Sequence, residues 1–129
     1  SVFVANKMIK MLINAGKQIK GSNVLILGVT FKENCPDIRN TKVIDVYKEL
    51  IDFGLEVDLY DPEADSQEVL DEYGVNLIPT ISKKYDGILL AVSHNEFASL
   101  KLSDLKKDSN TSVFDLKGFL PRNEVNSRL

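Results

Sequence analysis

A charged segment between an apolar run and a helical pattern carries the side chains with the clearest chemistry. Lys32, Glu33, Asp37 and Arg39 lie within eight positions there, shortly after the apolar run ends at Gly28. Ligands of open α/β sheets bind where strands end and helices begin, so this segment occupies the expected ligand edge. Two cations beside the free N–H groups of a helix start favour an anionic ligand, most simply a phosphate.

Three side chains, one of them Lys32, would face such a ligand. Lys32 follows the strand end by a few positions, where a long ammonium side chain reaches a phosphate. Phe31 offers an aromatic face for a base or sugar. Lys117 follows a later apolar run and would emerge at the same edge of a parallel sheet. A lone loop lysine is more often a solvated cation, but the neighbouring features favour the ligand interpretation here.

Arg39 has two interpretations that the residues leave open. Its guanidinium pairs with Asp37 or Glu33 as a clasp within the loop, or it binds a ligand phosphate through two hydrogen bonds. We expect Asp37 to accept backbone N–H groups and order the loop rather than act as a general base.

The single cysteine and the single histidine are weak candidates for catalysis. Cys35 lies between Asn34 and Pro36 with no group to activate it, which favours an incidental thiol. His94 follows the most apolar run without a Ser-His-Asp or metal-binding pattern nearby, so we expect it to cap or hydrogen-bond at the ligand edge. We predict no metal site, because these two residues are far apart in sequence.

Strand and helix patterns alternate along the chain. Apolar runs predict strands at 24–28, 56–60, 75–78, 87–92 and 112–116. Helical patterns cover 2–20, 41–53, 66–73 and 102–107, with Asn40 and Ser66 as expected N-caps. The expected fold class is α/β, a Rossmann-like open parallel sheet of about five strands with helices on both faces, preceded by a connecting helix. The polar tail from 117 to 129 is expected to be only partly ordered.

Composition excludes several functional classes. Sixteen basic and nineteen acidic residues leave a net charge of −3, which argues against nucleic-acid and membrane-surface binding. One cysteine permits no internal disulfide, so we expect a cytoplasmic protein. No apolar run approaches the roughly 20 residues of a membrane span. The chain opens in a helical pattern without an initiator Met, and we expect it to be part of a longer protein.

The first predicted turn departs from the dinucleotide-binding fingerprint G-x-G-x-x-G. Gly28 is followed by Val29, Thr30 and Phe31, with no second or third glycine. Asp61 ends the next strand but lacks the glycine loop that would support it. We therefore predict a Rossmann-like sheet without the usual NAD site.

Four segments together resemble a known family. They are G-V-T-F-K-E-N-C-P-D-I-R-N-T-K-V at 28–43, Y-D-P at 60–62, A-V-S-H-N-E-F at 91–97 and F-D-L-K-G at 114–118. These segments resemble the C-terminal domain of the UDP-glucose/GDP-mannose dehydrogenase family. The E-N-C-P-D-I-R-N form is most similar to the branch that oxidises UDP-N-acetylhexosamines. By this resemblance residues 1–20 are the end of a connecting helix from a central domain, and residues 21–129 are the UDP-sugar-binding domain.

The resemblance implies a part of an NAD-dependent UDP-sugar 6-dehydrogenase, which oxidises the C6 alcohol to the uronic acid in surface polysaccharide synthesis. In that family NAD is bound mainly by an N-terminal domain, and the catalytic cysteine lies in the central region. We therefore expect no catalytic residue and no activity in this chain alone. Its expected partners are the UDP-sugar and the other two domains, in a homodimer or larger oligomer.

The resemblance also assigns roles to individual positions. Phe31 and Lys32 match the family's substrate-contacting pair, and Arg39 matches an arginine that approaches NAD held by another domain. Lys117 falls where many members have an arginine in an Asp-Gly-Arg motif that contacts the nucleotide. Here Asp-Leu-Lys replaces a bidentate contact with a point charge.

Two alternatives come from other functional classes. A non-catalytic α/β domain would act through partner binding or oligomerisation, with the charged loop as a structural clasp. In that case Lys32→Ala and Arg39→Ala change stability and leave nucleotide binding unaffected. A response-regulator type of domain would need an acidic cluster at the strand ends; Asp61 is present, but no Asp-Asp pair ends the first strand.

Overall fold

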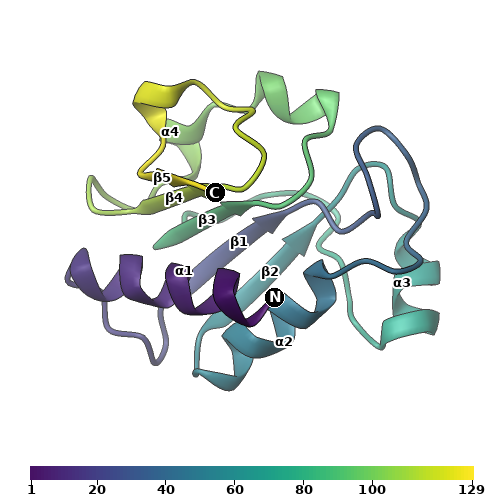
Figure 1. The fold of residues 1–129 in the computed structure, drawn as a ribbon, viewed down its shortest axis with the longest axis horizontal. Helices are drawn as coiled ribbons and strands as arrows, with labels where there is room; N and C mark the ends of the chain where they lie inside the picture. Colours follow the sequence, from purple (N-terminus) through teal and green to yellow (C-terminus); the bar gives the residue numbers. More distant parts are fainter.

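Five parallel strands form one sheet through the centre of the molecule (Figure 1). The computed structural model describes residues 1–129. The strand order is β2-β1-β3-β4-β5. The strands are β1 (Asn23–Leu27), β2 (Glu56–Tyr60), β3 (Gly87–Leu90), β4 (Ser112–Asp115) and β5 (Ser127–Arg128). The chain leaves β1 toward β2 and later pairs β3 on the other side of β1, so the carboxyl ends of β1 and β3 flank the topological switch point.

Alternating side chains along the strands face two separate apolar clusters. Val24 points into the cluster covered by α1 (Val2–Asn14) and α2 (Val43–Asp52). Its neighbour Leu25 points into the opposite cluster, covered by α4 (Leu102–Leu105) and two short 3-10 helices. Those are η1 (Asn95–Ser99) and η2 (Arg122–Glu124). The prediction of a parallel α/β sheet with helices on both faces is confirmed.

The first helix packs onto the sheet rather than away from it. Ala5, Met8 and Leu12 of α1 are fully buried in the same cluster as Phe114 of β4. The helix ends at Asn14, earlier than the predicted residue 20, and Gly16 follows with a φ of +80°. A left-handed glycine just past a helix is a common way for the chain to turn out of it. None of the helices is long and apolar enough to cross a membrane.

Both predicted N-caps are wrong. Asn40 adopts a left-handed φ of 59°, which asparagine tolerates, and α2 begins only at Val43. Instead, the Val43 N–H donates a hydrogen bond to Thr41 Oγ1 at 3.2 Å. The third helix, α3 (Ser66–Tyr73), is capped by Asp65, one residue before the predicted Ser66. The carboxylate of Asp65 accepts two backbone N–H groups of the first turn, which a serine hydroxyl cannot do as strongly.

Two predictions about strands are also wrong. The apolar run 75–78 forms no strand, because only the Ile78 N–H bonds to β2, donating to the Leu59 carbonyl at 2.9 Å. The tail, expected to be partly ordered, supplies β5 at the opposite edge. Asn126 guides that pairing through both its backbone and its side chain. Its N–H donates to the Val113 carbonyl at 2.9 Å, and its Oδ1 accepts the Val113 N–H at 2.7 Å.

Candidate functional site

A pocket of about 260 Å³ opens at the carboxyl edge of the sheet, on the side covered by α1 and α2. It spans the topological switch point, because its walls come from the loops after β1, β3 and β4 and from the starts of both helices. The residues that line the pocket include Thr30, Phe31, Lys42, Ala91, Val92, Leu116 and Lys117. The pocket therefore lies where an open α/β sheet is expected to bind its ligand.

The charge on the pocket wall is positive. Lys42 and Lys117 are exposed and line the pocket, while no Asp or Glu side chain does. The N-terminus of α2 adds the positive end of its dipole, since Lys42 and Val43 also form part of the wall. An anion such as a phosphate is the ligand that this wall attracts.

The predicted site residues divide into two groups. Phe31 is 56 % exposed and lines the pocket together with Lys117. Lys32 is exposed on the same loop as Phe31 but is not part of the wall. Arg39 lies elsewhere, against the acidic side of α3 with Glu68 and Asp71. The structure therefore brings Phe31 and Lys117 together at one pocket and leaves Lys32 outside its wall.

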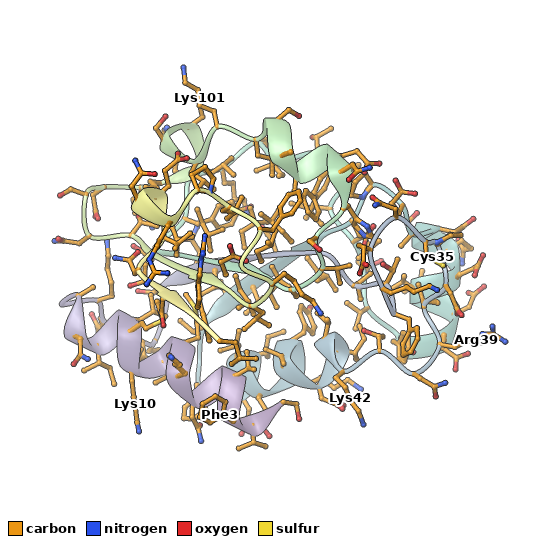
Figure 2. The ribbon with its side chains drawn as sticks, turned by 45° about the horizontal axis from the view of Figure 1, so that its top comes forward. Phe3, Lys10, Cys35, Arg39, Lys42 and Lys101 are labelled. Carbon is orange, nitrogen blue, oxygen red and sulfur yellow. The ribbon has the colours of Figure 1, made fainter.

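Arg39 is paired within its own loop. Its Nε and Nη2 donate to the two oxygens of Asp37, each at 3.0 Å, and its backbone N–H donates to Oδ1 at 2.9 Å. These hydrogen bonds from Arg39 lower the pKa of Asp37 to about 2. The expectation that Asp37 orders the loop is confirmed. The Arg39 side chain is 82 % exposed and projects outward from the molecule (Figure 2).

The segment after β1, which we call the ligand loop (residues 29–40), is fastened to β2 by Asp61. The carboxylate of Asp61 is fully buried. Its Oδ2 accepts the N–H groups of Val29 at 2.7 Å and Thr30 at 3.2 Å. Its Oδ1 accepts those of Glu63 at 2.7 Å and Ala64 at 3.0 Å. Asp61 thus points inward and joins two loops instead of facing a ribose.

His94 fastens the ligand loop to the end of β3. The ring is fully buried, with Nε2 lying 2.9 Å from Asp61 Oδ2 and 3.1 Å from Thr30 Oγ1. Its Nδ1 accepts the N–H of Asn34 at 2.9 Å. Next to it, the Asn95 N–H donates to Asn34 Oδ1 at 2.8 Å. The expectation that His94 forms hydrogen bonds at this edge is confirmed.

Gly28 allows the ends of β1 and β3 to approach each other. Its φ is +97°, and a Cβ built there would lie 2.6 Å from Val92 Cβ. The Gly28 N–H donates to the Tyr60 carbonyl at 2.9 Å, which keeps β1 paired with β2 up to the turn. Gly28 is therefore needed for the packing of the strand ends. The second and third glycines of the dinucleotide fingerprint are absent, and residues with bulky side chains take their place in the ligand loop.

Sequence reasoning missed Lys42 and the inward role of Asp61. Lys42 lies in the first turn of the helix that was expected to begin at 41. A cation at a helix start was the available signal for an anion-binding residue. Nothing in the sequence distinguishes an inward Asp61 from an outward one. Cys35 is a free, half-buried thiol on the ligand loop. No group of three or more His, Cys, Asp or Glu side chains is arranged to hold a metal ion.

Comparison with known proteins identifies similar sequences along almost the whole chain. Residues 25–122 match the family model described as "UDP-glucose/GDP-mannose dehydrogenase family, UDP binding domain". The chain is 44 % identical to UDP-N-acetyl-D-glucosamine 6-dehydrogenase of Salmonella typhi, over 98 % of this chain and 31 % of that protein. It is 42 % identical to Protein CapL of Staphylococcus aureus, over 96 % and 30 %. The chain therefore spans less than a third of these relatives.

Solved structures show the same fold. The UDP-D-ManNAc dehydrogenase from Pyrococcus horikoshii is similar with a TM-score of 0.75 at 18 % identity, over 97 % of this chain and 29 % of that one. The NDP-N-acetyl-D-galactosaminuronic acid dehydrogenase from Methanosarcina mazei Go1 is similar with a TM-score of 0.77 at 23 % identity, over 95 % and 27 %. At these identities the comparison supports the architecture alone.

Proposed function

The chain belongs to the UDP-glucose/GDP-mannose dehydrogenase family through its UDP binding domain, and from that premise we propose that its carboxyl-edge pocket binds the nucleotide part of a UDP-sugar. The observation that carries this proposal is the composition of the wall. An exposed aromatic ring, Phe31, stands beside two cations, Lys42 and Lys117, with no carboxylate among the lining side chains. A base, a ribose and a diphosphate need such a combination of stacking surface and positive charge.

Each lining group then has a role that follows from its chemistry. Phe31 stacks on the base or the ribose. Lys117 and Lys42 face the diphosphate together with the start of α2. Lys32 is exposed on the same loop but outside the wall, and we assign it to the part of the ligand that leaves the pocket, which is the sugar.

We extend the proposal to the whole enzyme on the strength of the relatives' names and of the family resemblance. The complete protein oxidises the C6 alcohol of a UDP-N-acetylhexosamine to a carboxylate, with two NAD accepting the two hydrides, in surface polysaccharide synthesis in the cytoplasm. NAD is bound mainly by an N-terminal domain, and Arg39 approaches that NAD. Residues 1–20, whose helix ends at Asn14, belong to the connection from the central domain, and residues 21–129 bind the nucleotide. The assembly is a homodimer or larger.

This division of labour predicts that the 129-residue chain has no catalysis of its own. The hydride acceptor site and the nucleophile belong to other domains in the proposed arrangement. We expect no NAD reduction when the chain is incubated with UDP-N-acetylglucosamine, followed by the absorbance of NADH. Measurable NADH formation would contradict the division.

A second candidate function is a structural clasp, and the paired Arg39 and Asp37 side chains favour it for that part of the loop. The two candidates make different predictions for the lysines. A clasp leaves nucleotide affinity unchanged when Lys32 or Lys117 is replaced. A nucleotide site instead predicts that these replacements change the nucleotide affinity.

The test is a calorimetric titration with UDP, GDP and NAD. We expect UDP to bind the wild-type chain, with affinity falling about tenfold in Lys117→Ala because a hydrogen bond to a charged group is lost. Lys32→Ala should affect a UDP-sugar more than UDP. Lys101→Ala is the matched control, since Lys101 is exposed and lies on the far side of the molecule from the pocket (Figure 2).

Equal UDP affinity in all four proteins would support the clasp instead. If the wild-type chain shows no heat with any nucleotide, the same titration on the complete enzyme decides. Silence there would contradict a nucleotide site.

A further inference from the structure

We propose that His94 is a positioning residue for nucleotide binding, which holds the ligand loop in shape through one neutral tautomer of its ring. The inference rests on the proposed function, because it concerns the loop that carries Phe31 and Lys32. His94 itself does not line the pocket. It acts through hydrogen bonds to the loop, whose Thr30 and Phe31 form part of the pocket wall.

The hydrogen bonds determine where the proton is. Nδ1 lies 2.9 Å from the Asn34 nitrogen, and that N–H can donate only to a ring nitrogen that carries no proton. The proton is therefore on Nε2, which donates to Asp61 Oδ2 at 2.9 Å. Asp61 is an acceptor for this proton because its two oxygens already receive four backbone N–H groups, an arrangement that suits the ionised carboxylate.

One ring thus controls several points of the ligand loop. It binds the Asn34 N–H directly, and it contacts Thr30 Oγ1 at 3.1 Å. The Thr30 hydroxyl in turn donates to the Lys32 carbonyl at 2.9 Å. Phe31 lies between Thr30 and Lys32, and its own N–H donates to the Asp37 carbonyl at 2.7 Å. His94 therefore stabilises the backbone on both sides of Phe31, directly at Thr30 and through the Thr30 hydroxyl at Lys32.

Protonation of the ring would break this arrangement at one atom. A second proton on Nδ1 would face the Asn34 N–H, and two donors repel each other. Asp61 is the ionisable group in contact with the ring. Only the ring with its proton on Nε2 alone therefore accepts the Asn34 N–H and donates to Asp61 at the same time.

Two substitutions separate the two ring nitrogens. Asparagine places an oxygen near the position of Nδ1 and can accept the Asn34 N–H, whereas it cannot reach Asp61. Glutamine places its amide near Nε2 and can donate to Asp61, whereas it leaves the Asn34 N–H without its acceptor. Asparagine is smaller than glutamine, and both are smaller than histidine, so the packing loss is greater in His94→Asn. Packing alone would therefore make His94→Asn the weaker binder, which is the opposite of the order that the hydrogen bonds predict.

The first measurement is NMR of the 129-residue chain. We expect the nitrogen shifts of His94 to report a proton on Nε2 alone, and the Asn34 amide to be protected from exchange. Protection should persist in His94→Asn and be lost in His94→Gln. A proton on Nδ1, or an Asn34 amide equally protected in both variants, would overturn the proposal.

The second measurement is the affinity for UDP-N-acetylglucosamine. We expect His94→Asn to bind within about threefold of the wild type, and His94→Gln to bind about tenfold more weakly, because a donor is left unpaired. Equal affinities in both variants would overturn the positioning role.

The two proposals fail in different ways. If the wild-type chain and the complete enzyme bind no UDP-sugar, the proposed function is wrong. The exchange of the Asn34 amide then still decides whether His94 holds the loop.

Discussion

At the scale of single residues, the ligand loop separates side chains that face the pocket from side chains that hold the loop. Phe31 faces the pocket, whereas Arg39 and Asp37 bind each other. The chemical types were readable from the sequence, and so was the loop-ordering role of Asp37. The partner of Arg39 was not predictable, because a guanidinium pairs with a carboxylate two residues away as readily as with a phosphate. Only the structure distinguishes these two partners.

The Arg39 pair predicts a measurable change at Asp37. The hydrogen bonds from Arg39 hold the pKa of Asp37 at about 2, below its ordinary value of 3.8. We expect Arg39→Ala to raise that pKa back toward 3.8, followed by an NMR titration of the carboxyl carbon. A lowered pKa means that the pair is complete at neutral pH and is lost only as pH falls toward 2. An unchanged Asp37 titration in Arg39→Ala would contradict the pairing.

At the scale of elements, strands β1 to β4 were predictable, including β2 at one edge of the sheet, whereas β5 at the other edge was not. Runs such as 24–27 and 87–90 are buried on both faces, which leaves a continuous apolar signal in the sequence. The run 75–78 has a similar signal but pairs through one hydrogen bond only. The edge strand β5 has two residues, and its pairing depends on the Asn126 side chain. A prediction from apolar runs therefore finds β1 to β4, adds a false strand at 75–78 and misses the two-residue β5.

The close contact at the turn after β1 predicts that alanine substitutions at two glycines with similar φ lower the stability by different amounts. Gly28→Ala places a Cβ 2.6 Å from Val92 Cβ and 2.9 Å from Val92 N, at a φ of +97°. We expect it to lower the free energy of unfolding by about 3 kcal/mol or more, since a strained φ adds to a clash. Gly16→Ala, at a φ of +80° with no heavy atom within 4 Å, should cost about 1 kcal/mol. Urea unfolding measures both, and equal losses would contradict the close approach of β1 and β3.

At the scale of the whole molecule, the two edges of the sheet do different things. The carboxyl edge carries the pocket, and the amino edge carries a cluster of ion pairs around the buried Asp86. Its Oδ1 lies 3.0 Å from the Lys17 ammonium, and its Oδ2 accepts a hydrogen bond from Lys107 at 3.0 Å. The cluster joins the segment after α1 to the starts of β3 and β4. The amino edge is thus held by ion pairs, and the carboxyl edge carries the pocket.

This amino-edge cluster predicts how stability depends on pH. Burial alone would raise the pKa of Asp86, but the Asn23 N–H and the two lysines lower it overall. A lowered pKa contributes stability at neutral pH that is lost as the solution becomes more acidic than about pH 4. We expect Asp86→Asn to cost about 2 kcal/mol at neutral pH and less in acid. Asp52→Asn, at an exposed position, is the control; equal urea curves for both variants would contradict the role of the cluster.

We propose that a nucleotide binds at the carboxyl edge between the ends of β1, β3 and β4. The most direct test is to follow the backbone amide signals of the chain during a titration with UDP. We predict that the largest changes occur at Phe31, at the start of α2 near Lys42 and at Lys117, with little change around Asp86. Changes centred on the amino edge, or spread evenly over the surface, would contradict the account.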